Sequence, residues 1–293
     1  MATDTSDRRG AGIDPATTVG PVHLTVSDLD RSLAYYGSAI GLREIERSGS
    51  RASLGAGDRE LLVLTELPGA RPARHHTGLF HFALRVPDRP SLAGWLAHAA
   101  RDRIALTGLS EHFVSEAIYM QDPDDHGIEI YRDRPREVWD GKVERMTTLP
   151  LDVDDLLREL DDPASEPFEG LPAGTDMGHV HLQVADVPEA IGFYRDVIGF
   201  DLMANYGRQA AFLSAGGYHH HVGANTWNSL GAPPAPKGSA SLRHATIVLP
   251  SADARERVLA RAAGDQEPVA REDGVLIRDP SGNGLLLAVG AAA

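Results

Sequence analysis

The stretch VGPVHLTVSDLDRSLAYYGSAIGL, residues 19–42, returns later in the chain as MGHVHLQVADVPEAIGFYRDVIGF, residues 177–200. The two align without gaps and share 9 of their 24 residues, which indicates an internal duplication. Each copy starts with strand-like alternation, passes an Asp-containing turn, and continues with apolar residues at helical spacing up to Gly41 or Gly199. The sequence therefore predicts a repeated unit that begins with a strand and a helix.

A second and weaker repeat follows each of these copies. FHFALRVPD at residues 80–88 corresponds to LRHATIVLPS at residues 242–251, and both precede helix-like runs. Both end in matching hairpins, MQDPDDHGIEIYR at residues 120–132 and IRDPSGNGLLLAV at residues 277–289. The chain is thus expected to hold four units of about 50 residues, each with the order strand, helix and about three strands.

The units divide the 293-residue chain into two expected domains. Residues 1–18 are polar and predict a loose tail. Residues 19–134 form the expected N-terminal domain with units one and two, and residues 178–293 form the C-terminal domain with units three and four. Residues 135–177 are acidic and rich in Pro, which is typical of a connector, with one short helix near residues 153–160.

Composition narrows the classes of function. The net charge of −14 argues against a nucleic-acid partner, and no apolar run is long enough for a membrane helix. The absence of cysteine excludes disulfides, thiolate metal sites and cysteine nucleophiles. The N-terminus lacks the apolar segment of a signal peptide, so we expect a cytoplasmic location.

Four βαβββ units, with a His in the first strand and a DP-turn hairpin that carries a Glu, resemble the vicinal oxygen chelate superfamily. This group includes glyoxalase I, type I extradiol dioxygenases and bleomycin-resistance proteins. The resemblance implies an α+β fold, in which paired βαβββ modules form two domains with open, U-shaped mixed sheets. It covers nearly all of the chain outside the tail and the connector.

The same resemblance implies a metal site. Strand side chains alternate between faces, so Glu129 opposes its apolar neighbours in GIEIY. In the resembled fold, His23, His81 and Glu129 would converge from three strands of units one and two. Two imidazoles and one carboxylate make the facial triad of non-haem Fe(II) oxygenases, which leaves positions open for a chelating substrate and O2.

The segment around Glu129 also resembles the local motif of type I extradiol dioxygenases. His112, Tyr119 and Glu129 fall at the spacing of that motif, although Asp125 and Ser110 depart from it. The resemblance implies that His112 lies beside the substrate and that Tyr119 hydrogen-bonds the ionised catechol oxygen. The alternatives are an exposed loop histidine and ordinary strand packing.

The C-terminal half offers a second cluster of imidazoles. By the logic of the repeat, His181 and His244 correspond to His23 and His81, and His220 could face the same cavity. These three would form a second metal site without a carboxylate. A vestigial site, or a polar network, is the alternative interpretation.

Two departures from the resembled enzymes stand out. Their metal lies in the C-terminal pair of units, whereas Leu286 replaces the carboxylate there. Their acid–base histidine lies on the last strand of the first unit of the active pair, and LLVL at residues 61–64 has none. His75 and His76, in the following loop, are the substitutes that the sequence offers.

The leading interpretation is an Fe(II)-dependent extradiol dioxygenase that cleaves a catechol-type aromatic with O2. Mn(II) suits the same ligands. The alternatives are a glyoxalase-like lyase or isomerase, a bleomycin-resistance-type protein that binds an aromatic ligand, and a scaffold with a decayed site. A homodimer is expected from the fold, because dimerisation covers exposed sheet edges.

Overall fold

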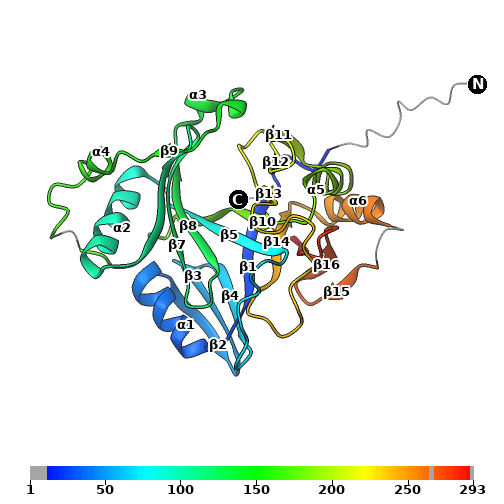
Figure 1. The fold of residues 1–293 in the computed structure, drawn as a ribbon, viewed down its shortest axis with the longest axis horizontal. Helices are drawn as coiled ribbons and strands as arrows, with labels where there is room; N and C mark the ends of the chain where they lie inside the picture. Colours follow the sequence, from blue (N-terminus) through cyan, green and yellow to red (C-terminus); the bar gives the residue numbers. More distant parts are fainter. Residues whose placement is uncertain (1–11, 166, 264–266, 291–293) are drawn as a thin grey trace, which may run out of the picture.

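The computed structural model describes residues 12–165, 167–263 and 267–290, most of which belong to two curled mixed β-sheets or to the helices that cover them (Figure 1). Residues 1–11 of the expected tail lie outside the described residues. The rest of that segment is not loose in the structure. The backbone N–H of Ile13 donates to the carbonyl of Gly199, and the first strand already begins at Thr18.

One sheet combines the first and fourth units. Within the described residues it has eight strands in the order β15-β16-β17-β14-β1-β4-β3-β2. At its centre β1 and β14 pair antiparallel, with His23 opposite His244. The strands are β1 (Thr18–Val26), β2 (Arg43–Ser48), β3 (Arg51–Ala56), β4 (Arg59–Glu66), β14 (Leu242–Leu249), β15 (Val269–Arg271), β16 (Gly274–Arg278) and β17 (Gly284–Val289).

The other sheet combines the second and third units, with one short strand from the connector at its edge. Its nine described strands run in the order β11-β12-β13-β10-β5-β8-β7-β6-β9, and β5 pairs antiparallel with β10 at the centre. They are β5 (Gly78–Arg85), β6 (Leu106–Glu111), β7 (Ser115–Gln121), β8 (Gly127–Asp133), β9 (Leu149–Pro150), β10 (Asp176–Gln183), β11 (Asp201–Asn205), β12 (Ala210–Ser214) and β13 (Val222–Asn225).

The helices lie on two sides of the molecule, with α1 and α2 on one side and α5 and α6 on the other (Figure 1). Trp95 on α2 donates from its indole N–H to the carbonyl of Ile40, which ties the helices of units one and two together. The unit helices are α1 (Leu29–Tyr35) with η1 (Tyr36–Ile40), α2 (Arg89–Asp102), α5 (Val187–Gly192) with η3 (Phe193–Ile198), and α6 (Ala252–Ala262). The connector holds α3 (Arg136–Trp139), η2 (Val143–Arg145) and α4 (Val153–Leu157), so the expected short helix near residues 153–160 is confirmed.

The repeated sequence has the same structural role in each half. The helix ends expected at Gly41 and Gly199 are confirmed, because both glycines adopt the left-handed conformation that other residues avoid. Buried Tyr36 donates to Asp122 in the hairpin turn of the next unit, over 2.9 Å. Tyr194 makes the matching contact with Asp279, over 3.0 Å. The units of one half are therefore joined by helices and turns.

Their strands, however, go to different sheets. We expected unit one to share a sheet with unit two, and unit three with unit four. In the structure β1 instead pairs with β14 of unit four, and β5 pairs with β10 of unit three. The expected pairing is therefore wrong, and each sheet is built from residues 12–133 and residues 176–290 together.

Candidate active site

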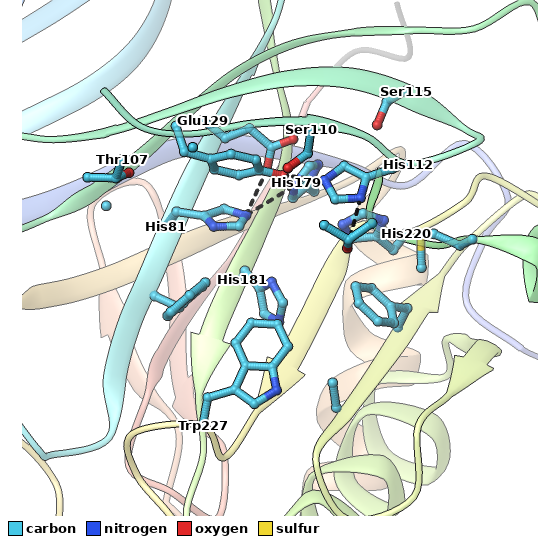
Figure 2. Close-up of a pocket in the computed structure, with 18 of the residues that line it drawn as sticks. His81, Thr107, Ser110, His112, Ser115, Glu129, His179, His181, His220 and Trp227 are labelled. Carbon is cyan, nitrogen blue, oxygen red and sulfur yellow. Dashed lines mark hydrogen bonds and ion pairs between the residues drawn. The ribbon is translucent and has the colours of Figure 1, made fainter. Parts of the chain in front are cut away.

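A cavity of about 790 Å³ lies against the nine-stranded sheet (Figure 2). Strands of the second unit form one wall, and strands β10 and β12 of the third unit, with His220 and Trp227 on either side of β13, form another. The volume is in the range of about 300–1,000 Å³ that is usual for small-molecule sites. Its apolar lining includes Phe80, Val114, Met146, Phe212 and Trp227.

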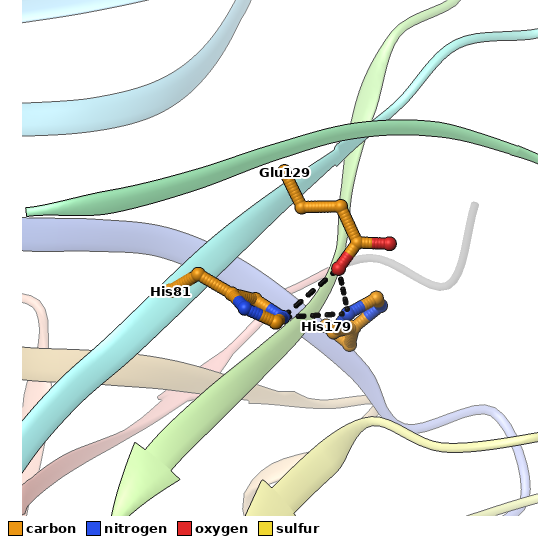
Figure 3. A group of neighbouring side chains, drawn as sticks. All are labelled: His81, Glu129 and His179. Carbon is orange, nitrogen blue, oxygen red and sulfur yellow. Dashed lines mark hydrogen bonds and ion pairs between the residues drawn. The ribbon is translucent and has the colours of Figure 1, made fainter. Parts of the chain in front are cut away.

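Three buried side chains that line this cavity point toward one another (Figure 3). His81 Nε2 lies 2.9 Å from Glu129 Oε2, and His179 Nε2 lies 3.1 Å from the same oxygen. The two imidazole nitrogens are 3.4 Å apart. Each of the three residues is less than 10% exposed. Three potential ligand atoms therefore lie close together at one place on the cavity wall.

Strand register explains why these three meet. Ala83 on β5 is opposite Glu129 on the parallel neighbour β8, and it is also opposite His179 on the antiparallel neighbour β10. His81 lies two residues before Ala83 and so points to the same face. The small Ala83 side chain between them leaves room for the longer side chains to converge above it.

The electrostatics of this group suit a cation. Burial alone would raise the pKa of the Glu129 carboxyl, but the adjacent His179 and His81 hold that pKa well below its usual range. Burial lowers the pKa of His179 to about 4, so its imidazole is neutral at neutral pH. A carboxylate and neutral imidazoles are the protonation states that a metal ion requires of its ligands.

The geometry of the group fits a metal site as well. The ligand atoms of His81, Glu129 and His179 all lie within 4.8 Å of one another. Two nitrogens and one oxygen form the donor set of non-haem Fe(II) sites. The residues present therefore fit the metal that the sequence led us to expect.

His23 does not belong to this group. It lies on β1 of the other sheet, where its Nε2 is 2.7 Å from Thr65 Oγ1 and its ring is 5.0 Å from that of His244. The expected ligand set of His23, His81 and Glu129 therefore needs correction, because it assumed that units one and two share a sheet. His179 takes the third place. Its signal was the alternating GHVHL, which puts His179 and His181 on one face of β10.

The three residues of the second expected metal site also lie in different sheets. His181 and His220 line the cavity, whereas His244 lies beside His23 in the eight-stranded sheet. His181 is opposite His81, and its Nε2 is buried without a hydrogen-bond partner in the described part of the chain. A Cβ at Gly223 would lie 2.7 Å from the His181 ring, so only glycine leaves space for that ring.

His112 and Tyr119 line the same cavity, on the side formed by the second unit; His112 is labelled in Figure 2. His112 Nδ1 lies 2.7 Å from the carbonyl oxygen of Thr147, which can only accept a hydrogen bond, so Nδ1 carries a proton. In the neutral ring, Nε2 then accepts from the Tyr119 hydroxyl, 2.7 Å away. Tyr119 is also the cross-strand neighbour of Glu129.

A further histidine reaches the cavity just before the last strand of unit three. The ring of His220 lies 4.0 Å, centroid to centroid, from that of His179. Burial lowers the pKa of His220 well below its usual range, so the ring is neutral at neutral pH. His75 and His76, the substitutes that the sequence offered for the acid–base residue, do not line this cavity, although His75 lines a smaller one.

The eight-stranded sheet does not repeat the site. In the aligned repeats Pro21 takes the place of His179, and Leu286 takes the place of Glu129. The structure thus keeps His23 and His244 without the two residues that would complete a ligand set. Among the described residues, one buried group of three possible ligands is found, that of His81, Glu129 and His179.

Two sheets of βαβββ units, one of them with a two-histidine, one-carboxylate group on its cavity, define a protein of the vicinal oxygen chelate class. The family model described as Glyoxalase/Bleomycin resistance protein/Dioxygenase superfamily matches residues 18–130 and 176–287, and the chain belongs to this superfamily. A protein of Bacillus subtilis (strain 168) named catechol-2,3-dioxygenase is 46% identical over 241 residues, which cover 80% of this chain and 83% of that protein.

Solved structures show the same fold at low sequence identity. Glyoxalase I from Zea mays superposes with a TM-score of 0.58 at 18% identity, over 93% of this chain and 92% of that chain. The cppA protein from Streptococcus pneumoniae TIGR4 superposes with a TM-score of 0.57 at 12% identity, over 95% and 99% of the two chains. In the described part of the chain, no helix is both long and apolar enough to cross a membrane.

Proposed function

We propose that this chain is an extradiol ring-cleaving dioxygenase that acts on a catechol-type aromatic with O2. The observation that carries the proposal is the convergence of His81, Glu129 and His179 on a cavity that also holds the His112–Tyr119 pair. The Bacillus subtilis relative, at 46% identity, bears the name of this activity. The reaction class breaks the ring carbon–carbon bond beside the diol and puts both atoms of O2 into the product.

The metal ligands in this proposal are His81, Glu129 and His179, and the metal is Fe(II), with Mn(II) as the alternative for the same donors. When bound, the metal supplies a chelating centre for the two adjacent substrate oxygens and the redox chemistry that O2 requires. The protein residues bind and orient the substrate and move its protons.

Tyr119 and His112 hold the substrate from one side. In the structure the Tyr119 hydroxyl donates a hydrogen bond to His112 Nε2, 2.7 Å away. Burial raises the pKa of Tyr119 well above its usual range, so the hydroxyl stays protonated. When a substrate is bound, this single O–H would turn from His112 to an ionised catechol oxygen. His112 then serves as the nearest proton donor and acceptor behind it.

His220 takes the acid–base role on the other side. In the resembled enzymes this residue comes from the last strand of the first unit in the active pair, and unit three is now that unit. His220 precedes β13, lines the cavity and contacts the ligand His179. It would accept the proton that leaves a substrate hydroxyl. A positioned base of this kind contributes about 10²–10⁴-fold to a rate.

The lining of the cavity favours uncharged ring substituents. Among the described residues that line it there is no Lys or Arg. A ring carboxylate away from the metal would therefore be desolvated without a cationic side chain to pair with, which is costly. We expect kcat/KM for a carboxylate-bearing catechol to be lower by about tenfold or more than for an alkyl-substituted catechol of similar size. Equal values for the two substrates, measured by oxygen uptake, would contradict this assignment.

The proposal is tested with the full chain purified under anaerobic conditions. About one Fe per chain and oxygen uptake with catechol are the expected results. One Zn or Ni per chain, with isomerase or lyase activity instead, would favour the glyoxalase-like alternative. A metal-free chain that binds an aromatic compound and consumes no oxygen would favour the bleomycin-resistance type. A glyoxalase-like site would need a second acidic ligand, whereas the group in the described residues holds one carboxylate.

The cellular location and the oligomeric state of the protein are proposals as well. We place the protein in the cytoplasm, on the grounds of its lack of cysteine. We also expect a homodimer, since the exposed outer strand β2 leaves a sheet edge that a second copy would cover. Fractionation and light scattering test these two points.

A further inference from the structure

A chain of hydrogen bonds runs away from the cavity behind His220. His220 Nδ1 lies 2.8 Å from Nδ1 of its neighbour His219, and His219 Nε2 lies 2.8 Å from Asp133 Oδ1. His219 is fully buried, and Asp133 is the last residue of β8, the strand that also carries Glu129. Within the described part of the chain no hydrogen bond engages Nε2 of His220, although the residue lines the cavity.

The direction of these hydrogen bonds follows from what each atom can do. An ionised carboxylate only accepts, so His219 must donate from Nε2 to Asp133. Burial would raise the pKa of Asp133, but His219 and Arg85 outweigh burial and hold that pKa below its usual range, so the carboxylate is ionised. Between the two Nδ1 atoms, one ring must donate and the other must accept.

The charge balance around Asp133 decides which ring donates. Arg85 pairs with Asp133 at 2.9 Å and with Asp176 at 2.6 Å, and Arg59 lies 3.6 Å from Asp176. Two guanidinium groups thus already balance the two carboxylates. A doubly protonated His219 would add an unbalanced positive charge at a fully buried position, which is costly. His219 is therefore neutral, and its Nδ1 carries a lone pair.

We propose that Asp133 and His219 together fix His220 as the tautomer with its proton on Nδ1, which leaves Nε2 as a proton acceptor on the cavity. A neutral His219 accepts at Nδ1, so His220 must donate from Nδ1 and keeps a lone pair on Nε2. Asp133 and His219 are thus positioning residues that act through His220. The catalytic role of that lone pair rests on the proposed function, whereas the tautomer rests on the hydrogen bonds alone.

The tautomer can be measured directly. Long-range ¹H–¹⁵N correlation spectra of the ¹⁵N-histidine-labelled full chain, loaded with diamagnetic Zn(II), separate a protonated ring nitrogen from an unprotonated one. We expect His220 to carry its proton on Nδ1 and His219 to carry its proton on Nε2. A wild-type His220 with its proton on Nε2 would overturn the proposal, and this measurement needs no variant that has to fold.

The variant His219→Phe keeps an aromatic ring in the buried site but removes both hydrogen bonds. His220 Nδ1 then faces a ring without an acceptor, so we expect its proton to shift to Nε2. Bound Zn(II) per chain should stay the same, and kcat of the Fe(II)-loaded chain should fall by about 10–100-fold. His220 retaining its proton on Nδ1 in this variant would contradict the role of His219.

The matched control is His221→Phe. His221 is the next residue along the chain, and its Nδ1 interacts with Ser214 and the backbone of Ala215, away from the chain of hydrogen bonds. The tautomer of His220 should be unchanged in this variant. Because the spectra report the tautomer without turnover, a failed catechol assay would overturn the proposed function and leave this inference standing.

Discussion

The Glu129→Gln variant is expected to lose its metal and, with it, oxygen uptake on catechol. The amide keeps the size of the side chain but removes the one negative charge that His81 and His179 surround at 2.9 and 3.1 Å. That charge pairs with the bound metal, and removing one partner of a buried charge pair costs about 3–5 kcal/mol. This corresponds to a drop in metal affinity of about 10² to 10⁴-fold. Metal content per chain and a metal titration measure the effect.

The control for this experiment is His23→Gln. His23 aligns with a cavity histidine and was an expected ligand, yet it hydrogen-bonds Thr65 in the other sheet. The variant should keep its metal and its turnover. Metal lost from His23→Gln and kept in Glu129→Gln would move the metal to the eight-stranded sheet, where His23 lies beside His244, and refute the site described above.

The His220→Gln variant is expected to keep the metal and lose turnover. Its ring lies beside His179 without sharing the contact with Glu129, so removing it should leave the ligand set in place. Loss of a positioned base lowers kcat by about 10²–10⁴-fold. Stopped-flow measurement of ring cleavage, with metal content determined on the same sample, separates the two effects.

His244→Gln is the matched control for His220. The sequence grouped the two residues, but His244 faces His23 in the eight-stranded sheet. Its replacement should leave kcat unchanged. If His220→Gln releases the metal, then His220 is a ligand and not the base. If His220→Gln keeps both its metal and full turnover, another group accepts the proton of the substrate hydroxyl.

Local patterns were enough to predict the units of this fold. The repeat around Gly41 and Gly199 gave the strand and helix of units one and three, because a left-handed glycine and helical spacing are properties of neighbouring residues. The last hairpin of unit two was sufficient to select Glu129, since its face follows from strand alternation. His112 and Tyr119 were found through the resemblance to the local motif of type I extradiol dioxygenases, which lies in the same segment as Glu129.

The pairing of the units could not be predicted from these patterns. Which strand lies beside β5 depends on contacts between residues about 100 positions apart, as in His81 opposite His181. The sequence of β5 is compatible with either partner strand. We assumed that units next to each other in the sequence also pair in space, which is usual but not general. The choice of His23 over His179 followed directly from that assumption. Asp133 and His219 were missed for the same reason, since 86 residues separate them.

The crossed pairing of the units makes the proposed metal centre dependent on both halves of the chain. His81 and Glu129 are made before the connector and His179 after it, and the other sheet is complete only with β17, which ends at Val289. Neither half of the protein contains all three of the candidate ligands His81, Glu129 and His179. A chain that stops before the third unit therefore holds two of the three candidate donors at most, and the full group can form only after β10 has been made.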